Sequence, residues 1–300
     1  MDIGIFSGVT GRGLEALVAD ARDAAERGFH TYWLSQIVQQ TEAMSMIGAA
    51  AQQVDGIRFG TSVVPTYPRH PMVMAEQAMT TSLLTGGRFT LGIGLSHQPV
   101  VEGQWGISFD KPVRHAREYL DALMPLVRGE RARFSGETIT ARGKLEIDAP
   151  EPPVLLAALG PQMLRIAGER CGGTITWMTG AATLGELTVP TISEAAAEAG
   201  RPAPEIAAGF PIWVTDDVDA ARSTASRTFE IYGQLPSYRA MLDREGLDGP
   251  ADLAIIGDEA TCADRLDELA GAGATHLVAS EFATDAEGRD RTRTFLAGRL

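Results

Sequence analysis

Cysteine and long apolar runs are both scarce in this sequence. The two cysteines, Cys171 and Cys262, lie far apart and have no Cys or His neighbour at metal-ligand spacing, so we expect buried thiols and no metal site. No window approaches about eighteen consecutive apolar residues, and the chain does not open with a basic stretch followed by an apolar one. Neither a membrane span nor a secretory signal is predicted, and a cytoplasmic protein is expected.

Positive charge is also in short supply. Asp and Glu number 39 against 26 Lys and Arg, which gives a formal net charge of −13. Nucleic acids and anionic membranes bind basic surfaces, so neither is an expected partner. We expect a small-molecule substrate and a homodimer. The 44% hydrophobic and 22% charged content is typical of a globular protein that buries a sizeable core.

Short apolar or β-branched runs alternate with helical patterns, which predicts parallel βα units. Eight runs fit strands, at residues 3–6, 31–34, 58–64, 89–93, 154–158, 174–177, 206–214 and 276–280. Helices are expected between them, at residues 14–27, 42–53 and 71–84 and from residue 161 onward. The pattern predicts a (β/α)8 TIM barrel with residues 1–300 as one domain. A doubly wound open sheet would show much the same alternation.

Two segments depart from the repeating unit and are interpreted as insertions. The first follows the fourth strand, with a helix at 112–127 and a hairpin at 133–147. The second lies between the seventh and eighth strands, with helices at 219–234, 237–244 and 261–270. Pro and Gly residues punctuate it, which predicts several short helices in place of one long one.

Motifs around the third and fourth strands narrow the choice of fold. The segments YPRHP (67–71), AEQA (75–78) and GGRFTLGIG (86–94) resemble the luciferase-like superfamily of flavin- and deazaflavin-dependent oxidoreductases. In that superfamily a helix ends in Gly-Gly-Arg-Phe and a strand follows as Leu-Gly-Ile-Gly. Further matches at REYL (117–120) and GDE (257–259) spread the resemblance over nearly the whole chain.

Within the superfamily, TSVVPTYPRHP (61–71) and GLSH (94–97) look most like the actinobacterial branch that uses the deazaflavin coenzyme F420. The resemblance therefore implies a barrel-shaped oxidoreductase with F420 as its cofactor. FMN-dependent members share the barrel and much of the strand-four motif, so FMN is the alternative cofactor.

The resemblance places a cofactor site on residues that follow several strands. Small residues after strand four let a flat ring approach the backbone, although glycines there also suit tight barrel packing. The helix that begins at Pro161 offers free N–H groups for a phosphate, with an ordinary strand-to-helix turn as the alternative. The family also has a cis peptide bond without proline at the place of Ser62-Val63. The predicted cofactor-binding residues are Ser35, Ser62, Val63, Gly94, Leu95, Ser96, Ala157, Ala158, Leu159, Gly160 and Trp177.

His97 is the candidate catalytic residue. It follows strand four, where related deazaflavin dehydrogenases often have a Glu. A His there can donate a proton near neutral pH or only hydrogen-bond to the cofactor or a loop. Ser35 and Gln36 stand where related dehydrogenases carry Asp-His, which argues against alcohol oxidation by such a pair. The predicted substrate-binding residues are Phe6, Gln36, Trp213 and Glu281, although aromatic residues such as Phe6 and Trp213 more often belong to the core.

The predicted function is hydride transfer between F420 and a small organic substrate, with reduction of an activated double bond or imine favoured over alcohol oxidation. An FMN-dependent monooxygenase is the first alternative, and a barrel that binds a flavin or deazaflavin without catalysis is the second.

Overall fold

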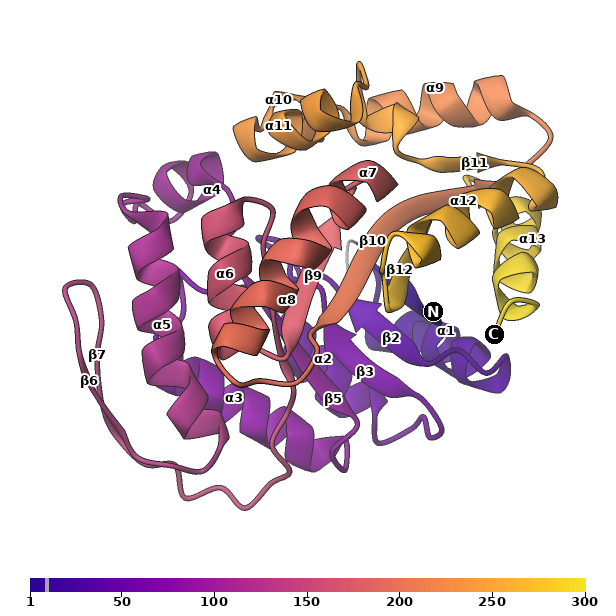
Figure 1. Ribbon diagram of the computed structural model, residues 1–300. Coiled ribbons are helices and arrows are strands. Elements are labelled where there is room, and N and C mark those ends of the chain that lie inside the picture. Colours follow the sequence, from indigo (N-terminus) through magenta and orange to yellow (C-terminus); the bar gives the residue numbers. More distant parts are fainter. Residues whose placement is uncertain (9–10) are drawn as a thin grey trace.

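A closed barrel of eight parallel strands forms the centre of the computed structural model, which describes residues 1–8 and 11–300 (Figure 1). In barrel order the strands are β1 (Asp2–Ser7), β2 (Thr31–Leu34), β3 (Arg58–Thr61), β5 (Phe89–Gly94), β8 (Val154–Ala157), β9 (Gly173–Trp177), β10 (Glu205–Val214) and β12 (His276–Glu281). β12 pairs with both β10 and β1, which closes the ring. The predicted TIM barrel is confirmed, and the open sheet is excluded because an open sheet would leave two edge strands.

Helices surround the barrel (Figure 1). They are α1 (Leu14–Glu26), α2 (Ala43–Ala50), α3 (Pro71–Leu84), α5 (Pro112–Val127), α6 (Pro161–Arg170), α7 (Ala181–Thr183), α8 (Val189–Glu198), α12 (Glu259–Gly271) and α13 (Ala286–Ala297). α3, α5 and α6 each begin with a proline in the first turn, where the fixed φ suits the helix and no N–H is lost. α3 and α5 have the predicted bounds.

The predicted third strand is broken. β3 ends at Thr61, the peptide bond between Ser62 and Val63 is cis as the resemblance implies, and β4 (Val64–Pro65) then pairs with β5. The sequence predicted one uninterrupted strand at residues 58–64 because Thr61, Val63 and Val64 are β-branched and no Gly or Pro separates them.

The two insertions are present and contain more elements than predicted. The first holds the unpredicted α4 (Gln98–Gly103) and the predicted hairpin, β6 (Ala132–Ser135) and β7 (Thr140–Gly143). The second holds α9 (Val218–Thr228), α10 (Glu230–Gln234), α11 (Pro236–Glu245), the short η2 (Pro250–Asp252) and the unpredicted β11 (Ile255–Gly257). β11 pairs with the far end of β10, and α9 to α11 lie together at one end of the barrel (Figure 1).

Trp33 fills the inside of the barrel. A Cβ added to Gly60 would lie 2.4 Å from the Trp33 ring, and one added to Gly4 would lie 2.7 Å from Trp33 Nε1. Leu155 and Val278 pack with it. The barrel interior is therefore a packed core, and a ligand site has to lie at one end of it.

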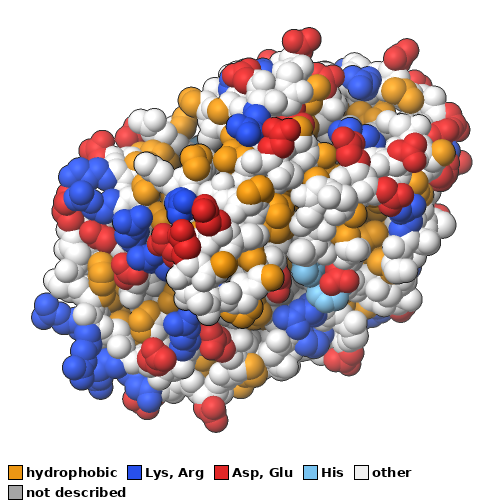
Figure 2. All heavy atoms as spheres, viewed as in Figure 1, with side chains coloured by type: hydrophobic (Ala, Val, Ile, Leu, Met, Phe, Trp, Pro, Cys, Tyr) orange, Lys and Arg blue, Asp and Glu red, His pale blue; other side chains and the backbone are white. Residues whose placement is uncertain are grey.

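One face of the molecule is mixed in charge. Acidic and basic side chains are interspersed on the face seen in Figure 2. Among the described residues, no helix is both long and apolar enough to span a bilayer.

Candidate active site

A cavity of about 690 Å³ lies at the C-terminal ends of the barrel strands. Its floor comes from residues at or just after the ends of β1, β2, β3, β5, β8, β9 and β12, and its cover comes from the insertion that holds α9 to α11. The volume is in the range of sites for small molecules and cofactors. TIM-barrel enzymes build their active sites at this same end.

The cavity brings together most of the residues singled out in the sequence. It is lined by all eleven predicted cofactor-binding residues, by the candidate catalytic residue and by two of the four predicted substrate-binding residues: Ser35, Ser62, Val63, Gly94, Leu95, Ser96, Ala157, Ala158, Leu159, Gly160, Trp177, His97, Phe6 and Gln36. These residues come from six strand ends that are distant in sequence. Their roles toward a ligand remain predictions.

Trp213 and Glu281 do not line the cavity, which corrects the expectation that both lie at the site. β10 continues past the barrel to pair with β11, so Trp213 packs against Ala221 of α9 and Phe282. Ser280 lines the cavity, and the next side chain along a strand points to the opposite face. Glu281 therefore points outward, where it forms an ion pair with Arg293.

The glycines of β5 serve two purposes. A Cβ on Gly92 would lie 1.9 Å from the carbonyl oxygen of Thr61, so this glycine permits close packing of β3 on β5. The Thr61 hydroxyl donates a hydrogen bond to the Gly92 carbonyl oxygen at 2.8 Å and accepts one from the Gly92 N–H at 2.9 Å. Gly94 lines the cavity, and a Cβ there would lie 2.7 Å from Val63 Cγ2. The packing interpretation thus explains Gly92, whereas Gly94 also leaves room at the cavity wall.

Two buried hydroxyl groups of the cavity lining have no hydrogen-bond partner among the described residues. They are Ser35 Oγ, after β2, and Thr176 Oγ1, in β9. A buried polar atom without a partner is unfavourable by about 1–3 kcal/mol. Polar atoms of a bound ligand would relieve that cost, so the two hydroxyls fit a ligand with a polar edge.

Gly160 marks the N-terminus of α6 at the cavity wall. It has an extended conformation with φ −85° and ψ 157°, and no side chain caps the helix there. The first N–H groups of a helix have no partner within the helix and attract anions. A Cβ added to Gly160 would meet nothing within 4 Å, so the space beside this helix start is open.

The cavity lining has very little charge. Among its described residues there is no Asp, Glu, Lys or Arg. Burial raises the pKa of Tyr232 and of Tyr238, so both phenols stay protonated at neutral pH. His97 is the only histidine among the described lining residues. Of these residues, it therefore has the side chain whose ordinary pKa is nearest to neutrality.

His97 sits on a fixed backbone between β5 and α4. Its carbonyl oxygen accepts hydrogen bonds from the N–H groups of Val100 and Val101, both at 2.9 Å. Its ring lies edge-on to Tyr238, with 5.9 Å between ring centroids. Burial lowers the pKa of His97, so the ring is neutral at pH 7. In that form it offers one N–H donor and one nitrogen acceptor.

An aromatic wall of Phe6, Trp177, Phe229, Tyr232 and Tyr238 closes one side of the cavity. Trp177 lies 5.6 Å from Phe6, 6.2 Å from Phe229 and 6.0 Å from Tyr232 between ring centroids. Tyr232 in turn lies 4.9 Å from Tyr238. Three of these rings come from the second insertion and were not predicted as site residues. Their aromatic character in an otherwise polar helical segment was the available signal.

Comparison with known proteins agrees with this fold. Residues 1–276 match the family described as luciferase-like monooxygenase. A 5,10-methylenetetrahydromethanopterin reductase of Methanolobus tindarius is 28% identical over 239 residues, which cover 79% of this chain and 72% of that protein. An F420-dependent glucose-6-phosphate dehydrogenase of Beutenbergia cavernae is 33% identical over 215 residues, covering 67% of this chain and 64% of that protein.

The fold has close structural counterparts. The solved structure of coenzyme F420 dependent tetrahydromethanopterin reductase from Methanopyrus kandleri has a TM-score of 0.85 at 22% identity. The match covers 100% of this chain and 98% of that chain, so the barrel and both insertions belong to a shared architecture.

Proposed function

Because this chain belongs to the luciferase-like monooxygenase family, we propose that it is an F420-dependent oxidoreductase that exchanges a hydride between the deazaflavin and a small organic substrate. The cavity is the observation that carries the proposal, since it combines small residues at strand ends, unpaired hydroxyls and an aromatic wall. F420 is favoured over FMN by the sequence motifs at residues 61–71 and 94–97 and by relatives whose names specify F420.

The residues of the cavity fit such a cofactor. Gly94, Ala157 and Ala158 leave space at the wall for a flat ring, and Ser35 and Thr176 offer hydroxyls to its polar edge. The N-terminus of α6 at Gly160 suits the phosphate of the cofactor tail. We assign ring binding to Gly94, Ala157, Ala158, Ser35 and Thr176, and anion binding to the N-terminus of α6.

When bound, F420 supplies the hydride chemistry, and the protein supplies orientation, a dry site and a proton. The aromatic wall excludes water from one side of the cavity. A ring nitrogen of His97 is the place where a proton is held or moved. Gln36 positions the loop, since its Oε1 accepts a hydrogen bond from the Ala43 N–H at 2.8 Å.

The direction we propose is reduction of an activated double bond or imine. Ser35 and Gln36 stand where related dehydrogenases carry Asp-His, and no carboxylate is among the described lining residues to assist a base in alcohol oxidation. An FMN-dependent monooxygenase remains the second candidate because of the family to which the chain belongs. Binding of F420 and of FMN separates these two candidates, and turnover of whichever reduced cofactor binds, with artificial acceptors, distinguishes an enzyme from a barrel that only binds the cofactor.

F420 is expected to bind at least about tenfold more tightly than FMN, a difference of about 1.4 kcal/mol. The reason is the F420-type sequence at residues 61–71 and 94–97, which includes the cavity-lining residues Val63, Gly94 and His97. Fluorescence or calorimetric titration of the purified protein with each cofactor measures the ratio. Equal or reversed affinities would contradict the assignment to F420.

Gly160→Val is expected to weaken F420 binding at least about tenfold while leaving the fold intact. The backbone at Gly160 already has a φ of −85°, which a β-branched residue adopts without strain, and the new methyl groups would occupy the open space beside the α6 N–H groups. Titration with F420 and thermal unfolding give the two readouts.

A matched control exists at Gly13, which also precedes a helix, has φ −80° and has open space around an added Cβ. Gly13 is not among the cavity-lining residues, so Gly13→Val should leave F420 affinity unchanged. If Gly160→Val bound F420 as well as the unaltered protein does, the anion site would have to lie elsewhere.

A further inference from the structure

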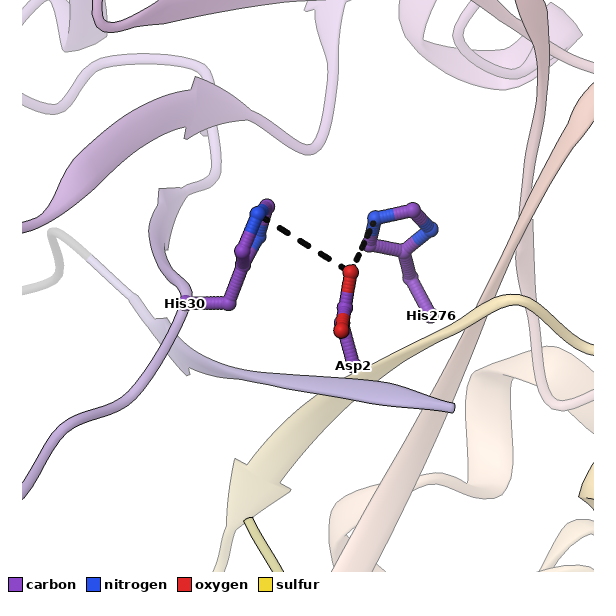
Figure 3. Close-up of side chains that lie close together, drawn as sticks. All are labelled: Asp2, His30 and His276. Atoms are coloured by element: carbon purple, nitrogen blue, oxygen red, sulfur yellow. Dashed lines mark ion pairs between the residues drawn. The ribbon is translucent and has the colours of Figure 1, made fainter.

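We propose that Asp2, His30 and His276 form a binding site for a divalent first-row transition metal ion of the Zn²⁺ type, at the opposite end of the barrel from the cavity (Figure 3). One potential ligand atom from each residue lies within 4.8 Å of the other two. Among residues 1–8 and 11–300, this is the only group of three or more His, Cys, Asp or Glu side chains that meets this distance.

The barrel backbone holds the three residues together. Asp2 begins β1 and His276 begins β12, and the two are direct partners in the parallel ladder. His30 immediately precedes β2, and its N–H donates to the Ile3 carbonyl at 3.0 Å. Ligands on paired strands are held more rigidly than ligands on loops, so the cluster does not depend on a mobile segment.

Each imidazole is oriented by a threonine. His30 Nδ1 lies 2.7 Å from Thr31 Oγ1, and His276 Nδ1 lies 2.9 Å from Thr275 Oγ1. These hydrogen bonds leave both Nε2 atoms directed at Asp2, as Figure 3 shows. Metal-bound histidines in proteins typically have their second ring nitrogen hydrogen-bonded in this way.

The distances suit a tetrahedral ion. Zn²⁺ binds His nitrogen and carboxylate oxygen at about 2.0–2.2 Å, so neighbouring ligand atoms are about 3.4 Å apart. His276 Nε2 lies 3.3 Å from Asp2 Oδ2, and His30 Nε2 lies 3.9 Å from the same oxygen. A small side-chain rotation of His30, which is exposed, closes the remaining gap. Water completes the coordination from the solvent side.

The donor set selects the class of ion. Two imidazoles and one carboxylate suit Zn²⁺, Co²⁺, Ni²⁺ or Cu²⁺, whereas Mg²⁺ and Ca²⁺ prefer oxygen ligands alone. His276 is partly buried, whereas Asp2 and His30 are exposed, so an ion can reach the three side chains from solvent.

The site was not expected from the sequence because its ligands lie at the starts of β1 and β12 and just before β2, which are far apart along the chain. His30 and His276 have no other Cys or His at metal-ligand spacing, and Asp2 reaches them only through the pairing of the first strand with the last. A bound ion would link the starts of β12, β1 and β2, and the proposal does not depend on the function assigned to the cavity.

The test uses full-length protein without a polyhistidine tag, freed of metal with a chelator and titrated with ZnCl₂ by calorimetry. We expect one equivalent to bind and the melting temperature to rise by several degrees with Zn²⁺ but not with MgCl₂. Titration with Co²⁺ should produce the visible absorption of tetrahedral coordination. Absence of saturable Zn²⁺ binding would overturn the proposal.

Substitutions locate the binding. His276→Gln and, separately, Asp2→Asn should each weaken Zn²⁺ binding by at least about tenfold. His70→Gln is the matched control, because His70 is exposed and lies outside the cluster, and it should leave affinity unchanged. Thr31→Val, which removes the hydroxyl that orients His30, should weaken binding less than loss of a ligand does. Unaltered affinity in both His276→Gln and Asp2→Asn would place any bound zinc elsewhere and refute the site.

Discussion

Replacing His97 with alanine is expected to lower the single-turnover rate of hydride transfer by about 10²–10⁴-fold if His97 provides the proton. No Asp, Glu, Lys or Arg is among the described cavity-lining residues, and the raised pKa values of Tyr232 and Tyr238 make those phenols poor proton donors near neutrality. A single turnover at saturating F420 isolates the chemical step from cofactor association.

The pH dependence of the unaltered protein provides an independent readout. Burial lowers the pKa of His97 below its usual 6.5, so the protonated ring is present only in the acidic range. If the protonated ring is the donor, the rate should rise as the pH falls through that lowered pKa and level off below it. In His97→Ala the residual rate should lose this dependence.

A second variant distinguishes proton transfer from positioning. His97→Gln keeps a hydrogen-bonding side chain but cannot titrate, so it should restore cofactor affinity without restoring the rate. If instead His97→Ala weakened F420 binding while the rate of the bound complex stayed near normal across this pH range, His97 would not be the proton source. Substrate or water would then have to supply the proton, since Glu281 points away from the cavity.

The sequence predicts the barrel well because each strand is a short apolar run bounded by turn residues. The run at residues 31–34 coincides with β2, and the proline-initiated helices at 71–84 and 112–127 coincide with α3 and α5. Local signals decide these elements. The break between β3 and β4 has no such signal, because Val63 and Val64 favour a strand as Phe59 and Thr61 do.

The candidate site is predictable wherever a residue lies at the end of a barrel strand. Gly94 to His97 and Ala157 to Gly160 follow β5 and β8, and both stretches reach the cavity. Side-chain direction was harder to predict, since a shift of one residue moves Glu281 to the outer face. The contributions of Phe229 and Tyr238 depend on how the second insertion folds back over the barrel, which no local pattern specifies.

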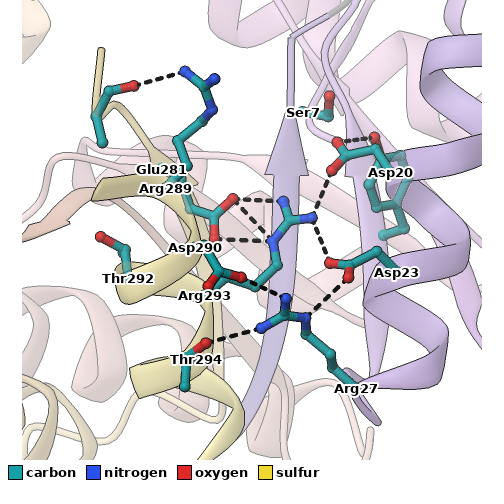
Figure 4. A network of polar contacts seen from close by, with 12 residues as sticks. Ser7, Asp20, Asp23, Arg27, Glu281, Arg289, Asp290, Thr292, Arg293 and Thr294 are labelled. Carbon is teal, nitrogen blue, oxygen red and sulfur yellow. Dashed lines mark hydrogen bonds and ion pairs between the residues drawn. The ribbon is translucent and has the colours of Figure 1, made fainter. Parts of the chain in front are cut away.

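Arg293→Met is expected to destabilise the fold by about 3–5 kcal/mol, the largest stability effect we predict. Arg293 lies in α13 and is largely buried, with 12% of its side chain exposed. Its guanidinium contacts Asp20 at 2.6 Å, Asp23 at 2.9 Å and Glu281 at 2.5 Å, as Figure 4 shows. Methionine fills similar space but leaves three neighbouring carboxylates without this cation. Urea unfolding at pH 7 measures the loss.

The deficit should shrink as the pH falls. Burial alone would raise the pKa of Asp20, but Arg293 and Tyr32 hold it below its usual value, whereas burial keeps the pKa of Glu281 raised. Asp20 therefore contributes stability above its unfolded pKa of about 3.9, and this is lost as the pH falls through the folded value. Without Arg293 both carboxylates have higher pKa values. They then take up protons at a higher pH than in the unaltered protein, which relieves the repulsion in the variant alone.

Arg291→Met is the matched control, two residues earlier on the same helix. Arg291 pairs with Asp216 and Glu259 at 2.8–3.0 Å, yet it is 33% exposed and its partners are more exposed still. Ion pairs open to solvent contribute about 0–1 kcal/mol, so this variant should lose at most about 1 kcal/mol and show little change in its deficit with pH. Equal losses in the two variants, or a deficit in Arg293→Met that stayed constant from pH 7 to 5, would mean that packing and not the buried charge network accounts for the stability at α13.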